Sequence, residues 1–357
     1  KPQHVIVSDE NSELEDTVVD HNSLVMKKKK LARHRFDFNF SNNPDVMLER
    51  LGELRQAIGE RLEGLIETLK TGGSAADKAE YLYCTRLEDK IALVIFSWKQ
   101  CEYIIEETDF EIKFTQLKID TLTGCIFDHA DKIVLMSATI IDYKRFARTL
   151  GIDQNDYEFI DVASEFDAEK SPIAIAQGFQ LNYKTLPKML PKIADAVEMI
   201  LENHPDEKGI IHTHTMQITK YLQDHFSRTK HGRRLLCRES GVVNEELVKS
   251  HFQSKEPTVI VSPSLSCGLD LKGDHGKFQI IVKLPYPPLG DKRIKKLADL
   301  DRDWYVNKMF TYLVQQCGRT TRSIDDESHT YVLDSGLIWQ LQQHKDRFPT
   351  HFIDRFV

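Results

Sequence analysis

The chain has 357 residues, of which 41% are hydrophobic and 29% are charged, and its formal net charge is −7. This length allows two or three domains with proper cores, and the negative balance excludes a globally basic surface. No apolar run approaches the roughly 20 residues of a membrane span, and no signal peptide opens the chain, so we expect a cytoplasmic protein without a membrane partner.

The six cysteines lie far apart in the sequence and form no C-x-x-C pair. This spacing favours reduced, buried thiols over a disulfide framework or a zinc site.

The first expected element is a strand from His4 to Ser8, which ends in the acids Asp9 and Glu10. An apolar strand that ends in acids is typical of an α/β protein, which presents carboxylates at the carboxyl edge of its sheet. Because the chain opens directly on a core strand, we expect it to be a piece of a larger fold.

Residues 17–110 differ in character from the rest. A long helix is expected from Pro44, with Asn42 or Asn43 as its cap, because apolar residues recur at helical spacing as far as Leu69. Two strand-like runs follow, KIALVIFSW (90–98) and CEYIIEE (101–107). The segment is therefore interpreted as an insertion, mostly helical, and its run Lys27–Lys30 as a solvated face rather than a nucleic-acid contact.

A second core strand is expected in KIVLMSATI (132–140), with the hydroxyls of Ser137 and Thr139 at its tip. From about residue 171, expected strands alternate with helices, which predicts a parallel sheet with right-handed crossovers. The expected strands begin at residues 209, 258, 278 and 329, and the expected helices cover 190–204, 216–226 and 304–318.

Near the end of the chain, the run QQCGRTTR places Arg319 three residues before Arg322, directly after Gly318. Three residues are roughly one helical turn, so the two arginines are expected on nearly the same side of a helix. Taken alone, the pair fits a solvated basic patch as well as a binding site.

The order of these pieces resembles that of superfamily-2 helicases: DE after a strand, then SAT, then S-x-G-L-D-L-x-G-D, then Q-x-x-G-R-x-x-R. The third piece contains Gly268–Asp270, which matches motif V of that family, and the last piece, Gln315–Arg322, matches its motif VI. The large insertion between DE and SAT, together with VKLPYPPLGD (282–291), is similar to the DinG/XPD branch. The resemblance implies an α/β fold of RecA-like parallel-sheet domains flanked by helices, with a mostly helical arch-like insertion. Its implied domains are the end of a first RecA-like domain (1–16), the insertion (17–112), a return to the first domain (113–142) and a second RecA-like domain (143–357).

The same resemblance implies an ATP-dependent DNA helicase that hydrolyses ATP between two RecA-like domains. Asp9 and Glu10 would hold Mg²⁺ through water, and Glu10 would also orient or deprotonate the attacking water. Arg319 and Arg322 would serve as arginine fingers. The implied ATP contacts come from motifs V and VI: Gly268, Asp270, Gln315, Arg319 and Arg322.

Motion 5′ to 3′ along single-stranded DNA and unwinding of forked or duplex DNA are also implied, with a nucleoprotein complex as a further partner and the nucleoid or nucleus as alternative locations. Phosphate contacts would come from two loops: Thr213, His214 and Thr215 in one, and Ser264 and Ser266 in the other. Ser137 and Thr139 would couple the ATP and DNA sites. His212 and His214 also fit ordinary strand histidines, and as an H-x-H metal pair they lack an obvious third ligand.

Two departures from the family pattern stand out. Asn11 and Ser12 stand where the family has Ala-His, and no G-x-x-x-x-G-K-[ST] loop occurs in the sequence. Whether an iron–sulfur cluster is present is undecidable, because its usual cysteines would lie upstream. The chain is interpreted as the C-terminal portion of an ATP-driven helicase. The alternatives are a remnant that binds nucleic acid or a partner without hydrolysis, and, with less support, a metal-dependent α/β nuclease.

Overall fold

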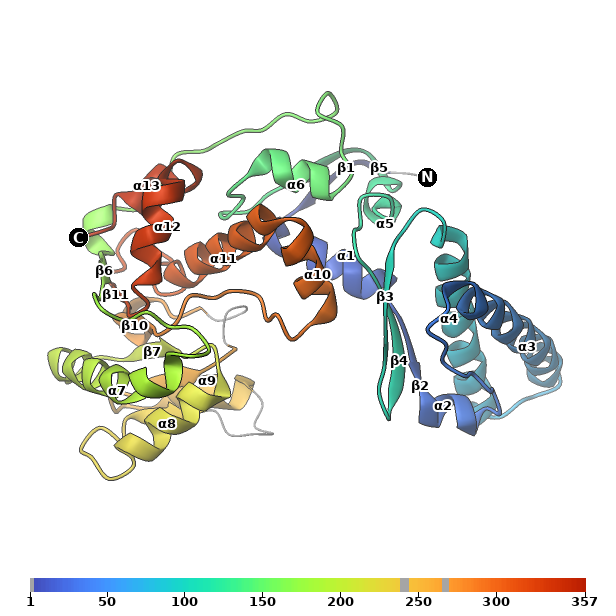
Figure 1. Cartoon of the computed structure of the whole chain (residues 1–357), viewed down its shortest axis with the longest axis horizontal. Helices are drawn as coiled ribbons and strands as arrows, with labels where there is room; N and C mark the ends of the chain where they lie inside the picture. Colours follow the sequence, from blue (N-terminus) through green and yellow to red (C-terminus); the bar gives the residue numbers. More distant parts are fainter. Residues whose placement is uncertain (1–2, 238–243, 265–269) are drawn as a thin grey trace. The chain divides into compact units, whose positions relative to one another are not determined.

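The computed structural model describes residues 3–237, 244–264 and 270–357, and the chain forms two compact units (Figure 1). Unit 1 comprises Lys1–Glu158 and Pro288–Arg302, and unit 2 comprises Phe159–Pro287 and Asp303–Val357. Residues 143–158 and 288–302, which lie within the predicted second RecA-like domain, therefore pack with unit 1. No helix within the described ranges is long and apolar enough to cross a membrane.

Unit 2 is built on a six-stranded sheet in the order β6-β11-β10-β7-β9-β8, and every neighbouring pair is parallel. The predicted parallel α/β sheet is thereby confirmed. Its strands are β6 (Ile173–Ile175), β7 (Gly209–His212), β8 (Leu235–Cys237), β9 (Val259–Ser262), β10 (Phe278–Ile281) and β11 (His329–Val332).

Both faces of this sheet are apolar, because successive side chains of a strand point to opposite faces. Ile211, for example, packs in a cluster with the apolar stripes of α7 and α8, whereas Ile210 packs with Leu247 of α9. The helices of unit 2 are α7 (Leu186–Asn203), α8 (Met216–Phe226), α9 (Asn244–Gln253), α11 (Arg302–Cys317), α12 (Gly336–His344) and α13 (Thr350–Ile353).

The strand order of unit 2 reverses between β7 and β10. From β7 the chain continues to β8 on one side, and from β10 it continues to β11 on the other. Parallel sheets bind their ligands at the carboxyl ends of the strands next to such a reversal. This places the segments that follow β7, β9 and β10 where a site is expected.

Unit 1 contains a much smaller parallel sheet, in which β1 (Gln3–Ser8) pairs with β5 (Ala130–Leu135). Within this chain, Val5 and Val7 of β1 are 50% and 59% exposed, and Val134 of β5 is 45% exposed. Their neighbouring helices are α1 (Leu14–Asn22), α5 (Gly124–Phe127) and α6 (Tyr143–Thr149).

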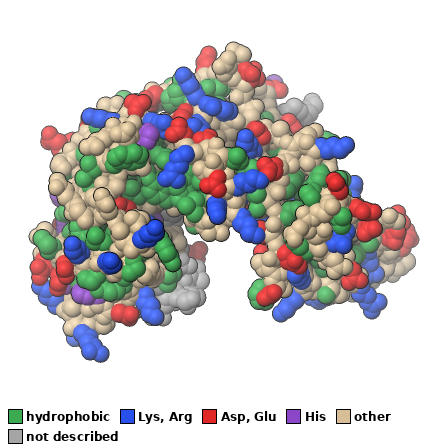
Figure 2. All heavy atoms as spheres, viewed as in Figure 1, with side chains coloured by type: hydrophobic (Ala, Val, Ile, Leu, Met, Phe, Trp, Pro, Cys, Tyr) green, Lys and Arg blue, Asp and Glu red, His purple; other side chains and the backbone are tan. Residues whose placement is uncertain are grey.

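The insertion in unit 1 pairs two long helices with an antiparallel sheet in the order β2-β4-β3. Its elements are β2 (Leu24–Lys27), α2 (Lys28–Arg33), α3 (Pro44–Lys70), α4 (Ala75–Ser97), β3 (Tyr103–Glu107) and β4 (Glu111–Gln116). Asn43 caps α3 with its side chain, as one of the two predicted caps. Acidic side chains gather on this hairpin of helices (Figure 2), among them the exposed Glu60, Glu63 and Glu67.

The expected strand over residues 90–98 is wrong, because most of this run lies in α4. A short apolar run cannot distinguish a strand from a buried helix, and here the start of the helix decides. Ser74 and Asp77 form a reciprocal capping box, and Leu87, Ile91 and Val94 then bury one helical stripe against α3.

A last helix of unit 1, α10 (Lys292–Leu300), comes from the C-terminal part of the sequence. Its Arg293 is buried, donates from Nη2 to the Glu15 carboxylate at 2.8 Å and from Nε to the Gln116 carbonyl at 2.9 Å. Nearer the surface, Lys296 pairs with Glu102. Charged contacts thus hold α10 against α1 and the end of β4.

Candidate functional site

The carboxyl end of β1 carries the predicted acidic pair. Asp9 and Glu10 are both exposed, and Asp9 Oδ1 accepts a hydrogen bond from the Glu10 backbone N–H at 2.7 Å. Glu10 has φ 57°, in the left-handed region that residues with side chains rarely adopt. The turn therefore presents both carboxylates to solvent directly after the strand.

Asn11 joins the two strand ends of unit 1. Its Nδ2 donates to the carbonyls of Ser8 at 2.6 Å and Met136 at 3.0 Å, and its backbone N–H donates to Met136 at 3.1 Å. The side chain is 2% exposed. This residue, noted in the sequence only as a departure from the family pattern, physically connects the acidic turn to the segment that leads into Ser137.

The predicted coupling residues lie in that segment. Ser137 and Thr139 hydroxyls are 3.2 Å apart, and Ser137 Oγ accepts from the Thr139 backbone N–H at 3.2 Å. Thr139 is buried and Ser137 half-buried. The two hydroxyls thus form one small polar turn at the tip of β5, as the sequence predicts.

In unit 2, the structure brings the predicted motif V and motif VI residues together. Arg322 Nε lies 2.9 Å from Asp270 Oδ1, and the Leu271 backbone N–H donates to the Arg319 carbonyl at 3.2 Å. Gly268 and Ser266 lie outside the described residues. Segments separated by about fifty positions therefore form one surface at the end of α11.

The prediction that Arg319 and Arg322 share a helical face is wrong. Helix α11 ends at Cys317, and both arginines lie in the turn that follows it. Arg319 is 5% exposed, whereas Arg322 is exposed. Gln315 is the member of the predicted set that does lie on α11, in its last turn.

The turn after β7 holds the predicted phosphate contacts, but two of its hydroxyls already have partners. Thr213 is fully buried, with its Oγ1 2.6 Å from that of Thr219, and Thr215 caps α8 by accepting from the Ile218 N–H. His214 between them has φ 57°. Ser264, after β9, is exposed. Among the described predicted contacts, Ser264 is thus the one residue in the exposed class.

Two histidines at this edge have lowered pKa values, of which His212 is buried and His214 is half-buried. Burial lowers the pKa of His212 to about 3, and the neighbouring His214 adds to the effect. Burial also lowers the pKa of His214 to about 4. The Nε2 atoms of both are buried without a hydrogen-bond partner, which is unusual for interior polar groups.

Part of the chain also matches a known protein family. The family model of the helicase C-terminal domain matches residues 197–353. The match covers less than half of the chain. The matched residues include β7 to β11, the Arg322–Asp270 pair and both of these histidines.

Solved structures share the fold of nearly the whole chain. An XPD helicase matches with a TM-score of 0.59 and 16% identity over 96% of this chain and 67% of that chain. Xpd4 of S. tokodaii gives 0.56 and 15% over 95% and 73%, and an XPD structure described as apo gives 0.58 and 16% over 96% and 75%. The resemblance to DinG/XPD-like helicases is confirmed at the level of fold. No curated protein matches the sequence significantly.

Within the helicase C-terminal domain, sequence reasoning missed Asp326. Its Oδ2 accepts from the backbone N–H groups of Arg322 and Ser323 at 2.7 Å each, and its Oδ1 accepts from that of Gly273 at 2.9 Å. Burial raises the pKa of this carboxyl, but these backbone donors outweigh it and hold the pKa below its usual value. Asp326 thus fixes the motif VI turn to the segment after Asp270, and only its position four residues after Arg322 could have suggested this.

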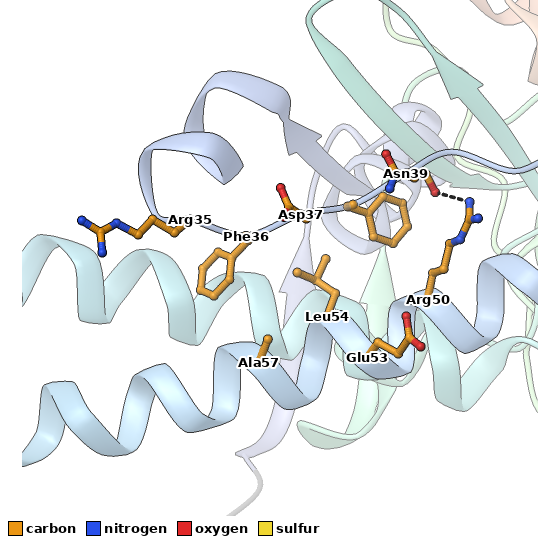
Figure 3. A pocket seen from close by; sticks show the side chains of 9 residues that line it. Arg35, Phe36, Asp37, Asn39, Arg50, Glu53, Leu54 and Ala57 are labelled. Atoms are coloured by element: carbon orange, nitrogen blue, oxygen red, sulfur yellow. Dashed lines mark hydrogen bonds between the residues drawn. The ribbon is translucent and has the colours of Figure 1, made fainter.

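A separate pocket of about 350 Å³ lies in the insertion, outside the helicase domain (Figure 3). Its lining mixes charges of both signs, and Arg50 Nη1 donates to the carbonyls of Asn39 at 2.7 Å and Phe40 at 3.1 Å. Arg50 therefore holds the segment before α3 in place. The lining residues are Arg35, Phe36, Asp37, Phe38, Asn39, Arg50, Glu53, Leu54 and Ala57.

Proposed function

We propose that the chain serves in an ATP-dependent DNA helicase of the DinG/XPD-like type, as the part that contains the complete second RecA-like domain and the arch-like insertion. The observation that carries the proposal is the joining of Asp270 and Arg322 by an ion pair within a matched helicase C-terminal domain. In such an enzyme, residues of motifs V and VI must act together on one nucleotide, and this pairing supports that arrangement.

The exposed acidic turn fits the Mg²⁺ that ATP brings. Mg²⁺ prefers oxygen ligands and keeps several of its waters, so the carboxylates of Asp9 and Glu10 suit it through water. ATP would supply the phosphoryl group that is transferred to water. Glu10 would orient or deprotonate that water, and Arg319 and Arg322 would neutralise charge on the phosphates, with Gln315 and Gly268 as further nucleotide contacts.

For Arg322, binding to phosphate requires an exchange of partners. In the described structure its guanidinium faces Asp270, at the surface, where an ion pair is worth only about 0 to 1 kcal/mol. A planar guanidinium donates two parallel hydrogen bonds to phosphate oxygens, as it does to the oxygens of a carboxylate. Because the exposed pair is weak, its loss costs little when Arg322 binds phosphate, which suits a residue that acts only when ATP is present.

The DNA track is proposed to follow the carboxyl ends of β7 and β9. Ser264 and Ser266 would contact phosphates, with the backbone of Thr213, His214 and Thr215 lining the track, and Ser137 and Thr139 would couple it to the ATP site. Such contacts read no base sequence, so the substrates would be single-stranded and forked DNA of any sequence, with 5′ to 3′ movement and strand separation. Binding would weaken steeply with salt.

One observation favours a second candidate, a helicase-like protein that binds nucleic acid or a partner without hydrolysing ATP. Arg319 is almost fully buried in the described structure, so its side chain is already packed inside unit 2 without a nucleotide. The two candidates differ in what Arg322 does. Its exposed guanidinium adds little to stability, so a loss of hydrolysis in an Arg322 variant would reflect catalysis.

The deciding measurement is ATP hydrolysis by the full-length protein with and without single-stranded DNA, in wild type, Glu10→Gln and Arg322→Ala. We expect DNA-stimulated turnover that falls by about 10³- to 10⁵-fold in Arg322→Ala, with DNA affinity retained. Glu10→Gln should bind ATP but not turn it over. Arg233→Ala, an exposed arginine of the same unit, is the control. Absence of turnover in the wild type, with DNA binding intact, would establish the binding-only candidate.

A further inference from the structure

A cluster of possible metal ligands lies in unit 2 away from the predicted ATP and DNA residues. Glu198 and Glu202 stand four residues apart on α7 and so share one face of the helix. His231 belongs to the loop between α8 and β8 (residues 227–234, the α8–β8 loop). One ligand atom from each of the three lies within 4.8 Å of the others.

The histidine distinguishes this cluster from a pair of carboxylates alone. His231 is only 4% exposed, and its Nε2 is buried without a hydrogen-bond partner. A buried imidazole nitrogen without a partner costs free energy unless something binds it. A neutral imidazole binds a metal ion through the lone pair of such a nitrogen.

The α8–β8 loop holds His231 in place. The His231 backbone N–H donates to Thr229 Oγ1 at 3.2 Å, and the ring packs edge-on against Phe226. Gly232 approaches Phe226 so closely that an added Cβ would lie 2.4 Å from its carbonyl oxygen. The turn is therefore tightly packed and leaves the imidazole little freedom to move.

A second contact fixes the loop to the helix that carries the glutamates. Arg234 donates to the backbone carbonyls of Leu201 at 3.2 Å, His204 at 2.7 Å and Glu207 at 2.9 Å. These bonds anchor the α8–β8 loop to the C-terminal end of α7. Both sources of ligands are thus positioned before any ion arrives, which is the condition for a site with useful affinity.

We propose that Glu198, Glu202 and His231 bind a divalent transition-metal ion, Zn²⁺ in the first place, which joins α7 to the α8–β8 loop. An imidazole with two carboxylates suits Zn²⁺ better than the Mg²⁺ of nucleotide sites, which prefers oxygen ligands. Three protein ligands leave a fourth position for water. Ligand atoms about 2.0 to 2.2 Å from one tetrahedral Zn²⁺ lie roughly 3.4 Å apart, so atoms that lie within 4.8 Å of one another close on the ion by rotation of the glutamate side chains.

Lys230 is the competitor of the ion. Its Nζ lies 2.7 Å from Glu202 Oε1, but the two side chains are 68% and 50% exposed, so the pair is weak and easily displaced. The lysine must leave the carboxylate when the metal binds. Its removal should therefore strengthen metal binding, which is the opposite of what removal of a ligand does.

The test is a calorimetric titration of the full-length chain with Zn²⁺, paired with the visible absorption of bound Co²⁺. We expect one Zn²⁺ per chain at this site. In Glu198→Gln, Glu202→Gln and His231→Gln, the affinity for Zn²⁺ should fall by more than about 10- to 100-fold, which is the loss typical of an outer-shell partner. Binding should strengthen several-fold in Lys230→Gln. Co²⁺ should show no sulfur charge-transfer band, which separates this site from the cysteines.

A matched control lies on α3. Glu63 and Glu67 are exposed and also stand four residues apart, and Glu67 also pairs with a lysine, Lys70, at 2.8 Å. Among the described residues, no histidine forms a possible metal site with them. Glu63→Gln and Glu67→Gln should leave Zn²⁺ binding unchanged. If His231→Gln fails to fold, the two α7 glutamine variants decide.

Hydrogen exchange gives a second readout, since Zn²⁺ should slow exchange in the α8–β8 loop of the wild type but not of Glu202→Gln. The proposal is overturned if Glu198→Gln and Glu202→Gln bind Zn²⁺ as the wild type does, or if the α3 variants lose as much affinity as they do. It is independent of ATP hydrolysis and stands or falls without it.

Discussion

The two parallel sheets of this chain start from similar sequences and end in different surroundings. In unit 2, VIVS of β9 and FQII of β10 are completely buried. In unit 1, the equally apolar HVIVS of β1 leaves Val5 and Val7 at least half exposed. The strands do not differ in composition but in what covers them. In unit 2 six strands carry helices on both faces, whereas in the part of the chain that the structure describes β1 and β5 pair just with each other.

This difference shows that apolar periodicity predicts a strand but not its burial. Parallel strands are normally covered on both faces, and a pair of strands alone is marginally stable. Within this chain, contacts other than sheet burial also hold unit 1 together. The buried Arg293–Glu15 pair and the bridge made by Asn11 are two such contacts.

The largest effect is expected from Arg293→Ala, which should destabilise unit 1 by about 3 to 5 kcal/mol, because the variant keeps a buried carboxylate but loses its cation. Hydrogen exchange of α1 and β4 would measure the change. Lys296→Ala on the same helix removes an exposed partner of Glu102 and should cost at most about 1 kcal/mol. Equal effects of the two variants would show that α10 does not hold unit 1 through its buried charge.

A direct comparison of the sheets uses the same substitution in each. Val261→Ala in β9, which is fully buried, should cost about 1.5 to 3 kcal/mol, whereas Val7→Ala in β1, which is 59% exposed, should cost a few tenths. The measurement is the exchange of strand amides in each unit. A large cost for Val7→Ala would mean that β1 is covered in solution.

Lowering the pH should reduce the stability of unit 2 through three of its histidines. The pKa of His212 is lowered to about 3 and those of His214 and His251 to about 4, in each case mainly by burial. A lowered pKa means that the neutral ring stabilises the folded state above the unfolded value of about 6.5, and that this stability is lost as the pH falls from there towards 4. Each histidine should contribute roughly 1.4 kcal/mol per pH unit.

Urea unfolding between pH 7 and pH 4.5, followed by the exchange of unit 2 amides, would measure this dependence. His251→Gln should reduce the slope with pH even where it lowers the stability at pH 7. A slope unchanged in that variant would contradict the assignment of the effect to this ring.

Sequence patterns predicted much of the fold and rather less of the site. The parallel sheet of unit 2 and the long helix from Pro44 follow from periodicity and capping, which are local. The failures depend on contacts distant in sequence. KIALVIFSW reads as a strand until α3 is there to bury its helical stripe, and Arg319 and Arg322 share a helical face only if α11 continues past Cys317.

The site residues that sequence missed are those that position others. Asp326 accepts hydrogen bonds from three backbone N–H groups. Because almost every residue has a backbone N–H, the sequence does not indicate which of them will donate. Asn11 was visible as a departure, but its role required the partner strand β5, more than a hundred residues away. Direct catalytic candidates have recognisable residue types, whereas their supports are defined by geometry.

Asn11 gives a further test of unit 1, with a modest expected effect. Asn11→Ala removes the two side-chain bonds to the carbonyls of Ser8 and Met136 and should cost about 1 kcal/mol, because water can reach these strand ends once the side chain is gone. Hydrogen exchange at Met136, whose neighbourhood links the acidic turn to Ser137, would measure it.

The control is Asn11→Asp, which keeps the acceptor towards the Ser8 hydroxyl but replaces the amide donor. If the bridge acts through its donor, both variants should loosen the two strand ends, and Asn11→Asp should do so more, because a buried carboxylate then faces two carbonyl oxygens. Protection unchanged in both variants would mean that the β1–β5 ladder alone holds the acidic turn beside Ser137. In that case the exposed sheet of unit 1 would be more self-sufficient than its burial suggests, and the contrast with unit 2 would narrow.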